Sequence, residues 1–287
     1  MKAKKSLGQN FLVDKRVAGR ILSVVSPSRN ELILEVGPGH GALTELLAER
    51  AGFVLAVELD HELFEKLCKE LPLYNLKLVE NDILNVDIEA LITDVVSKWN
   101  LAHPGNPIET VRVVANLPYN ISTAVVSKFI RARPLIKDLT LMLQREVAER
   151  IASPPGGKEY GILSVISQLY AKTKIVFNVA PGSFRPVPKV ESSVIQLEFY
   201  DSSTVAEHNE DLLAKVVRSA FSQRRKTIHN SLRATVAEID PKLKSDEVYT
   251  IIEAAGIEHV RRAETLSSAE FVKLSNTFLR FIQQVTS

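Results

Sequence analysis

A glycine-rich turn near the amino terminus sets the fold class that this sequence predicts. Residues 31–36 form a mainly apolar run, residues 37–41 read Gly-Pro-Gly-His-Gly, and leucines at helical spacing follow over residues 42–49. The run predicts a strand and the leucines predict a helix. Glycines between them permit a tight turn and let a ligand approach the bare backbone. This order is typical of the nucleotide-binding edge of an α/β sheet.

The alternation of apolar runs and helical patterns continues over the first two hundred residues. Further strands are expected at residues 53–57, 76–79, 111–115 and 139–143, with a helix at residues 61–71. After a helix around residues 145–151, the runs 163–169, 173–179 and 193–199 are expected to complete the sheet. Such alternation indicates a mostly parallel sheet with crossover helices.

The composition changes after Tyr200. The polar segment 201–204 reads as a linker, and apolar residues then recur at helical spacing around residues 212–221, 248–255 and 271–282. At 287 residues the chain exceeds the size at which one hydrophobic core usually keeps growing. We therefore expect two domains, an α/β domain over residues 1–200 and a small all-helical domain over residues 201–287.

Basic residues are unevenly distributed although the formal net charge is only +2. The first twenty residues contain many lysines and arginines but only one acid, Asp14. Between Asp211 and Glu238 there is no acid, and the basic residues there are Lys215, Arg218, Arg224, Arg225, Lys226 and Arg233. Such clusters favour a local anionic partner, for which nucleic acid is the usual candidate, over a merely solvated face.

Several classes of protein do not fit this sequence. The single Cys68 excludes an intramolecular disulfide, and no apolar stretch approaches the ~20 residues that span a bilayer. The basic start lacks the apolar core of a signal peptide. The six histidines are scattered, so no zinc-type ligand set is expected. We expect a cytoplasmic protein without a metal or a membrane contact.

Acidic residues follow two of the predicted strands. Glu58 ends the second strand, twenty-one residues beyond Gly37, where a carboxylate can accept hydrogen bonds from ribose hydroxyls. Asp82 follows the third strand and can accept a hydrogen bond from an adenine amino group. Because Gly37, Gly39 and Ala42 also satisfy the dinucleotide-binding pattern, these residues predict a nucleoside-containing cofactor without deciding which one.

The segment Asn116-Leu117-Pro118-Tyr119 follows the fourth predicted strand directly. The amide oxygen of Asn116 and the carbonyl of Leu117 can accept the two N–H groups of an exocyclic amine, and Tyr119 can stack on the attached ring. Bases taken out of a stack are held by hydrogen bonds to one edge and by an aromatic face. The alternative is an ordinary turn, in which Asn and Pro are common.

These segments resemble the ribosomal RNA adenine dimethyltransferase family. The resemblance extends from the amino-terminal segment to the last helices, and it includes Glu58, Asn81 and Asp82. The longer matching segments are residues 6–12 (Ser-Leu-Gly-Gln-Asn-Phe-Leu), 35–41 (Glu-Val-Gly-Pro-Gly-His-Gly), 116–120 (Asn-Leu-Pro-Tyr-Asn), 184–190 (Phe-Arg-Pro-Val-Pro-Lys-Val) and 221–232 (Phe-Ser-Gln-Arg-Arg-Lys-Thr-Ile-His-Asn-Ser-Leu). Residues 184–190 and 221–232 make the match specific to the bacterial branch acting on small-subunit rRNA.

The resemblance implies a fold, a reaction and a partner. The fold is a Rossmann-like S-adenosylmethionine-dependent methyltransferase sheet with a small all-helical carboxyl-terminal domain that binds RNA. The reaction is dimethylation of the N6 amino groups of two adjacent adenosines in the 3′-terminal hairpin loop of 16S rRNA. The partner is that rRNA in a small ribosomal subunit or its precursor, and the enzyme is expected to act as a monomer.

The resemblance also implies roles for particular residues. The catalytic residues would be Asn116, Leu117, Pro118 and Tyr119, with Phe184 as a candidate for the second face of the adenine unless it is a core aromatic. Arg224, Arg225 and Lys226 are expected to bind RNA from a helix, on which successive residues point about 100° apart; the alternative is that they brace the two domains. S-adenosylmethionine would be held by Asn10, Leu12, Gly37, Glu58, Asp82 and Asn116.

Other functions fit the sequence less well. The resistance-type methyltransferases of large-subunit rRNA share the cofactor fold but resemble residues 184–190 and 221–232 less. A nicotinamide oxidoreductase would need an acid or base aimed at the cofactor, and none is evident. A non-catalytic RNA-binding factor would not need Glu58, Asp82 and Asn116. DNA adenine methyltransferases lack a counterpart of residues 223–230.

Overall fold

A computed structural model describes residues 9–201 and 204–286 of the chain. Two compact units divide it, one formed by residues 1–148 and 172–199, the other by residues 149–171 and 200–287. Residues 149–171, which the sequence assigned to the first domain, therefore pack with the carboxyl-terminal helices. Across the described residues, no helix is long and apolar enough to cross a membrane.

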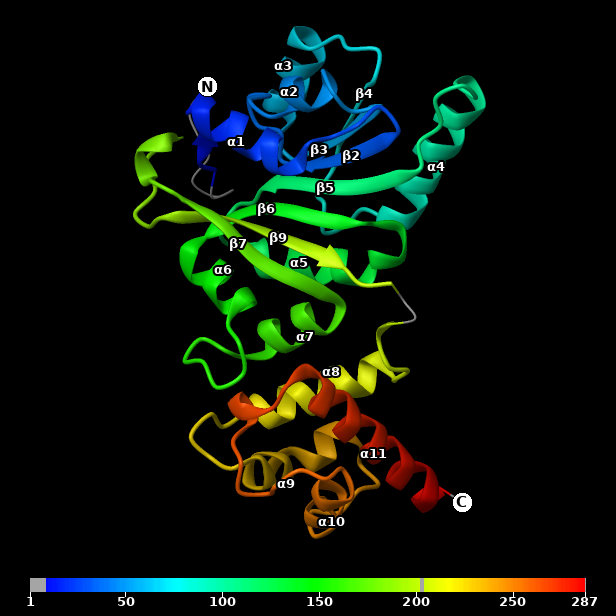
Figure 1. The fold of residues 1–287 in the computed structure, drawn as a ribbon, viewed down its shortest axis with the longest axis vertical. Coiled ribbons are helices and arrows are strands. Elements are labelled where there is room, and N and C mark those ends of the chain that lie inside the picture. Colours follow the sequence, from blue (N-terminus) through cyan, green and yellow to red (C-terminus); the bar gives the residue numbers. More distant parts are fainter. Residues whose placement is uncertain (1–8, 202–203, 287) are drawn as a thin grey trace. The chain divides into compact units, whose positions relative to one another are not determined.

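The first unit is built on a seven-stranded sheet with strand order β4-β3-β2-β5-β6-β9-β7 (Figure 1). Its first four neighbouring pairs are parallel, and β9 runs antiparallel to β6. The strands are β2 (Glu31–Val36), β3 (Phe53–Glu58), β4 (Leu76–Glu80), β5 (Thr110–Asn116), β6 (Asp138–Gln144), β7 (Ala171–Val179) and β9 (Ser192–Phe199). The predicted mostly parallel α/β sheet is confirmed.

The register of the parallel strands brings the predicted site segments to one edge. Val36 lies opposite Val57 on β3 and Ala115 on β5, and Glu58 lies opposite Glu80 on β4. The carboxyl ends of these four strands therefore meet. The residues that follow each strand, from the glycine turn to the segment after Asn116, converge there.

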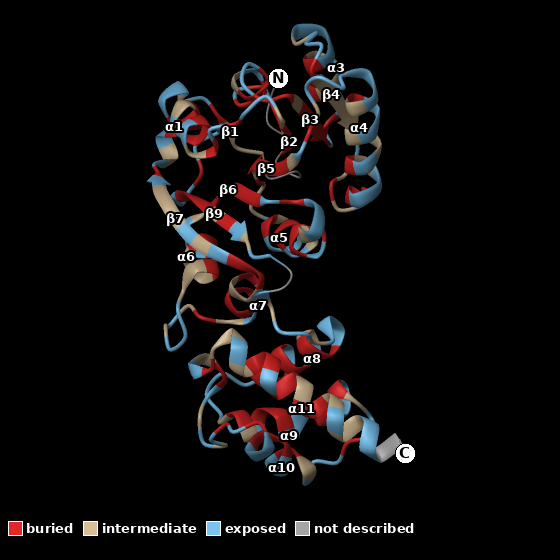
Figure 2. Cartoon of the chain, turned by 45° about the vertical axis from the view of Figure 1, so that its right-hand side comes forward, coloured by how far each residue is buried: buried red, intermediate tan, exposed pale blue. Residues whose placement is uncertain are grey.

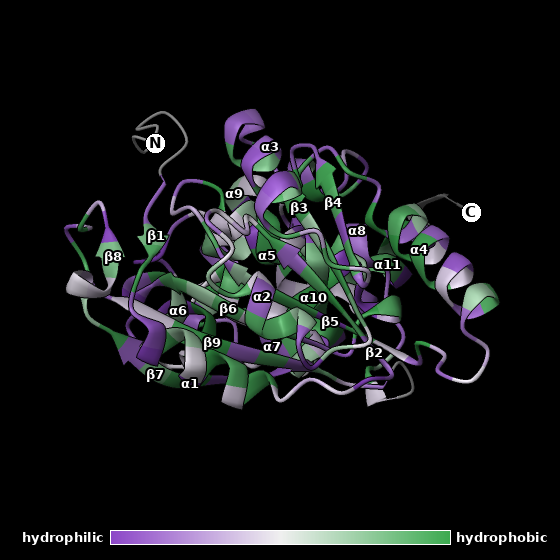
Figure 3. Cartoon of the chain, turned by 90° about the horizontal axis from the view of Figure 1, so that it is seen from above, coloured by the Kyte–Doolittle hydropathy of each residue, from purple (hydrophilic) through white to green (hydrophobic). Residues whose placement is uncertain are grey.

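Helices cover the sheet and bury one face each. β2 is buried along its whole length, which explains its nearly continuous apolar sequence. Figure 2 shows the buried strands in red, while the outer faces of the flanking helices are exposed; in Figure 3, α3 is largely hydrophilic. The helices of this unit are α1 (Lys15–Val25), α2 (Thr44–Ala48), α3 (His61–Glu70), α4 (Ile88–Ala102) and α5 (Ser122–Arg131), with short 3-10 turns η2 (Arg133–Leu135) and η3 (Pro181–Ser183); α6 (Arg145–Ala152) leads into the second unit.

Aspartates mark where three of these helices begin. The side chains of Asp14, Asp60 and Asp87 accept hydrogen bonds from the first-turn N–H groups of α1, α3 and α4. Each satisfies a donor that has no partner within its helix. Asp60 is placed by this cap directly after Glu58, so a local helix signal also shapes the candidate site.

The second unit is all helical within the described residues. Its core is formed by apolar side chains such as Val165, Val217, Leu232, Ile251 and Phe271, one from each helix. The helices are α7 (Ile162–Tyr170), α8 (Glu210–Phe221), α9 (Ile228–Ile239), α10 (Glu247–Ala254) and α11 (Ser268–Thr286), with the 3-10 turn η5 (Ala263–Thr265). The prediction of a strand at residues 163–169 is wrong, because a short buried apolar run has the same composition in a helix as in a strand.

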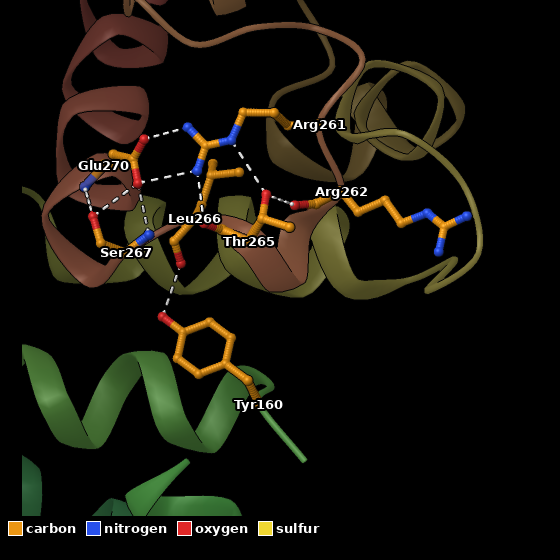
Figure 4. A network of polar contacts seen from close by, with 7 residues as sticks. All are labelled: Tyr160, Arg261, Arg262, Thr265, Leu266, Ser267 and Glu270. Carbon is orange, nitrogen blue, oxygen red and sulfur yellow. Dashed lines mark hydrogen bonds and ion pairs between the residues drawn. The ribbon is translucent and has the colours of Figure 1, made fainter. Parts of the chain in front are cut away.

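A polar network holds the loop before α11 (Figure 4). Arg261 donates to both carboxylate oxygens of Glu270, at 2.5 and 3.4 Å, and to the carbonyl of Thr265. Glu270 also accepts from the backbone of Ser267, whose hydroxyl accepts from the Glu270 N–H, which is a capping box. The Arg261 guanidinium holds the pKa of Glu270 low, at about 2. Tyr160 donates to the Leu266 carbonyl and ties α7 to the same loop.

Candidate active site

A pocket opens at the carboxyl edge of the parallel strands. It is lined by residues from the amino-terminal segment, the glycine turn, the ends of β3 and β4, and the segment after β5. These residues are Gln9, Asn10, Phe11, Val36, Gly37, Gly39, Val57, Glu58, Leu59, Leu63, Asn81, Asp82, Ile83, Asn116, Leu117, Pro118, Tyr119, Asn120 and Ile121. The structure thus brings together five of the six predicted cofactor residues and the whole Asn-Leu-Pro-Tyr segment.

The glycine turn follows β2 and forms the floor of this pocket. Gly37 and Gly39 have φ values of 67° and 59°, which L side chains rarely adopt. A Cβ at Gly39 would also lie 3.0 Å from the ring of Phe11. Backbone conformation and the close approach of Phe11 therefore both require glycine at position 39.

Glu58 is fixed at the end of β3. Its carboxylate accepts hydrogen bonds from the Gly39 N–H at 3.1 Å and from the Asp60 N–H at 2.8 Å, and only 5% of the residue is exposed. Burial raises the pKa of Glu58, while these two backbone bonds oppose the rise. The carboxylate is oriented by the backbone on both sides, as an acceptor for a pair of ligand hydroxyls requires.

Asp82 lies at the neighbouring strand end. Its side chain accepts from the Leu84 N–H at 2.9 Å, and the Asn81 N–H donates to the Glu58 carbonyl at 3.0 Å. The turn after β4 is thereby attached to the end of β3. Two carboxylates from adjacent strands consequently face one pocket, spaced along its length as the sequence predicted.

Asn116 has a defined side-chain orientation. Its Nδ2 donates to the backbone carbonyl of Asn10 at 3.0 Å. A carbonyl can only accept, so the amide nitrogen must be the atom that faces Asn10. The side-chain oxygen therefore lies on the opposite side of the amide, as an acceptor for a donor in the pocket.

The segment after Asn116 is held at several points. The Leu117 N–H donates to the Met142 carbonyl on β6 at 3.2 Å, and the Pro118 carbonyl accepts from the Ile121 N–H at 3.3 Å. Leu117 is buried, whereas Tyr119 is only half-buried. This arrangement directs backbone carbonyl groups and one aromatic ring toward the pocket on a rigid turn.

The amino-terminal segment crosses the edge of the pocket as a short strap. Its strand β1 (Phe11–Leu12) pairs antiparallel with β8 (Phe184–Arg185), and Gln9 donates to Asp60 at 3.0 Å. Asn10 and Phe11 line the pocket. Leu12 does not: it is 7% exposed, belongs to the core and lines a smaller cavity beside the glycine turn. Its predicted contact with the cofactor is corrected to a packing role.

Glu35 lies at that smaller cavity, which it shares with Gly37 and Gly39. The residue is 2% exposed, and its Oε2 has no hydrogen-bond partner among the described residues. Burial raises the pKa of Glu35 to about 7; the Thr44 hydroxyl opposes this and the charge of Glu58 adds to it. A buried carboxylate oxygen without a partner next to a ligand pocket suits a cationic group of the ligand.

Phe184 is not placed as predicted. Its side chain is 1% exposed and packs in the core with Leu12, and it does not line the pocket. The pairing of β8 with β1 covers the ring, so it has no free face for a base. The core alternative considered for this aromatic residue is the one that the structure contains.

The predicted RNA-binding residues do not lie on a helix. Arg224, Arg225 and Lys226 form a turn between α8 and α9, because the Thr227 side chain caps α9 and starts that helix afresh. Arg224 donates to the carbonyls of Lys158 and Tyr160, both at 2.9 Å, and so braces the second unit itself. Arg225 and Lys226 are exposed.

Some pocket residues were not singled out from the sequence. Leu59 follows Glu58 and is 48% exposed at the pocket, where an apolar side chain can cover a ligand ring. Its position directly after the acidic residue at a strand end was an available signal. Ile83 and Ile121 gave no such signal, because isolated apolar residues at turns are common. Within the described parts of the chain, no three His, Cys, Asp or Glu side chains gather as metal ligands.

Comparisons with known proteins identify the family. A family model described as "Ribosomal RNA adenine dimethylase" matches residues 1–274. The protein named "Ribosomal RNA small subunit methyltransferase A" of Geobacter metallireducens is 43% identical over 97% of this chain and 96% of its own, and that of Alkaliphilus oremlandii is 40% identical over 97% and 93%.

Solved structures show the same fold. A dimethyladenosine transferase from Plasmodium falciparum superposes with a TM-score of 0.77 at 26% identity, covering 96% of this chain and 98% of the other. The 23S rRNA methyltransferase ErmE superposes with a TM-score of 0.65 at 24% identity, covering 93% and 99%, and supports the fold alone. The resemblance seen in the sequence is thereby confirmed, and the chain belongs to the ribosomal RNA adenine dimethylase family of methyltransferases.

Proposed function

We propose that this enzyme uses S-adenosylmethionine to dimethylate the N6 amino groups of two adjacent adenosines in the 3′-terminal hairpin loop of 16S rRNA. Its relatives named as small-subunit rRNA methyltransferases support the choice of RNA. The observation that carries the chemistry is the orientation of Asn116, whose amide nitrogen is held by Asn10 and whose oxygen is left for an amine donor.

The pocket fits S-adenosylmethionine residue by residue. Glu58 would accept the ribose hydroxyls, Asp82 the adenine amino group, and Gly37 would allow close approach of the backbone. The unpaired oxygen of Glu35 suits the positive charge of this molecule. When bound, the cofactor supplies a methyl group on a sulfonium centre with a good leaving group, so the protein needs alignment more than a strong base.

The residues after β5 would align the accepting amine. Adenine N6 is a poor nucleophile because its lone pair is delocalised into the ring. Hydrogen bonds from its two N–H groups to the Asn116 side-chain oxygen and the Leu117 carbonyl favour a more tetrahedral nitrogen, which directs the lone pair toward the methyl carbon. Pro118 restricts the backbone between these acceptors, and Tyr119 offers a ring on which the adenine can stack.

Dimethylation requires the same site to work twice. N6-methyladenine retains a single N–H and brings an additional methyl group. A site that relies on one amide and one carbonyl can lose one of these hydrogen bonds and still hold the base through the other bond and the stacked ring. A site with an obligatory charged base would have to be reset between transfers.

Binding of the RNA is assigned chiefly to Arg225 and Lys226. Both are exposed in the turn between α8 and α9, where they can contact phosphates. Arg224 would support them by holding the turn through its two carbonyl bonds. A monomer acting on the small ribosomal subunit or its precursor, in the cytoplasm, accounts for these features without a second chain.

Methyl transfer to purified RNA particles tests this function. Small ribosomal subunits that lack the mark are incubated with the enzyme and S-adenosylmethionine, and the modified bases are mapped. Two adjacent dimethylated adenosines in the 3′-terminal hairpin are expected. Transfer only to 23S rRNA would support the resistance-type reaction, and absence of any transfer together with binding of NAD would support an oxidoreductase.

A further inference from the structure

The ring of Tyr119 is held from two sides. Its backbone carbonyl accepts a hydrogen bond from the Ser122 hydroxyl at 3.2 Å, in the first turn of α5. Its phenol oxygen lies 2.9 Å from the hydroxyl of Ser192, so the two hydroxyls form a hydrogen bond. The ring between these two points is half-buried and lines the pocket. Both the base of the side chain and its tip are therefore restrained.

Ser192 is a rigid anchor for the phenol. It is 1% exposed and is the first residue of β9, where it lies opposite Gln144 on β6. The adjoining Glu191 is bonded twice to Arg145: its carbonyl accepts from the Arg145 N–H at 3.0 Å, and its carboxylate from the guanidinium at 2.7 Å. The strand pairing thus continues past Ser192 rather than fraying there.

The bond spans the sheet edge from one structural element to another. Tyr119 belongs to the turn that follows β5, whereas Ser192 belongs to β9, which is two strands away in the sheet. A tyrosine that only packed by its ring would not need a buried hydroxyl partner at its tip. A polar bond between segments 73 residues apart orients the ring specifically.

We propose that Ser192 is a positioning residue for the methyl transfer, because its hydroxyl sets the tilt of the Tyr119 ring on which the target adenine stacks. This inference rests on the proposed function. Loss of the bond leaves the ring in the pocket but lets it rotate about its side-chain torsions. The adenine amine then meets Asn116 and Leu117 in the correct geometry for a smaller fraction of the time, which slows the chemical step more than it weakens binding.

The test compares three single-residue variants with the full-length enzyme. Ser192→Ala removes the partner, and Tyr119→Phe removes the same bond from the pocket side without altering β9. Ser193→Ala is the matched control: this serine is 0% exposed, and its hydroxyl bonds Asn178 at 2.8 Å. Because successive residues of a strand face opposite sides of the sheet, Ser193 cannot reach Tyr119.

The measurement is the single-turnover rate of methyl transfer to small subunits lacking the mark, together with KM for those subunits and the affinity for S-adenosylmethionine. Ser192→Ala and Tyr119→Phe are each expected to lower the rate by about three- to tenfold, the range for loss of one hydrogen bond. KM and cofactor affinity should change by less than about twofold. The double variant should be no slower than either single variant, since both remove one interaction.

Several outcomes would overturn the inference. An unchanged rate in Ser192→Ala, multiplied effects in the double variant, or an equal loss in Ser193→Ala would each show that Ser192 does not act through the Tyr119 hydroxyl. Melting temperatures are measured alongside, and if Ser192→Ala does not fold, Tyr119→Phe alone decides, because an unchanged rate there refutes the role of the bond. An inactive wild-type enzyme would instead refute the proposed function.

Discussion

The buried carboxyl group of Glu35 leads to a specific prediction about pH and stability. Burial raises its pKa from 4.5 to about 7 in the folded protein. In the unfolded chain the group ionises near 4.5, so the unfolded state loses its proton first as the pH rises. Stability from the protonated form is therefore fully present below pH 4.5 and is lost as the pH rises to about 7.

The magnitude follows from the size of the shift. One pKa unit corresponds to about 1.4 kcal/mol, so the rise from 4.5 to about 7 corresponds to a loss of about 3 kcal/mol. Glu35→Gln keeps the shape of the side chain but cannot ionise. The variant should gain stability relative to the wild type as the pH rises, with the difference between the two proteins changing by about 3 kcal/mol between pH 4.5 and pH 8.

Urea denaturation of both proteins without ligand, at pH 5, 6, 7 and 8, measures this difference. Parallel pH curves for the wild type and Glu35→Gln would refute the argument, because they would mean that Glu35 ionises equally in both states. Titration with S-adenosylmethionine extends the test. The wild type should bind the cofactor more tightly at pH 8 than at pH 6, and Glu35→Gln should lose that dependence.

Three further predictions concern the pocket and the basic turn. Glu58→Ala should weaken S-adenosylmethionine binding by about ten- to a hundredfold in calorimetry, through the loss of charge-assisted hydrogen bonds of about 1.5–3 kcal/mol, and unchanged affinity would remove Glu58 from the site. Asn116→Ala should slow single-turnover methyl transfer by ~10²–10³-fold, so a near-normal rate would rule out the amine-binding mechanism. The double change Arg225→Ala and Lys226→Ala should lower affinity for small subunits and reduce the salt slope by up to ~0.7–0.9 per phosphate contact, at unchanged cofactor affinity. Arg224→Ala should instead lower the melting temperature, and the reverse pattern would exchange the roles of these arginines.

The sheet could be predicted because each parallel strand has a distinctive sequence. Strands such as β2 and β5 are nearly continuous apolar runs, and each ends at a residue with a polar function, Glu58 on β3 and Asn116 on β5. The run 163–169 was misassigned because its apolar composition does not distinguish a buried helix from a buried strand. Its helical state depends on packing with the second unit, which no local pattern reveals.

The details of the site depend on contacts between distant segments. The orientation of Asn116 is fixed by the Asn10 carbonyl, 106 residues away in the sequence. Phe184 is buried by its pairing with the amino-terminal strap, and Arg224 is tied to a loop 64 to 66 residues before it. A sequence pattern can indicate which residue types gather at a sheet edge. It does not indicate which of them turn inward to the core.

The most direct test of the central claim is mapping of the methylated bases on small ribosomal subunits that lack the mark. Purified enzyme and isotopically labelled S-adenosylmethionine are used, with Asn116→Ala as the control. The account predicts two methyl groups on N6 of each of two adjacent adenosines in the 3′-terminal hairpin loop of 16S rRNA, and almost none with the variant. Methylation of a different RNA, or equal methylation by wild type and Asn116→Ala, would contradict it.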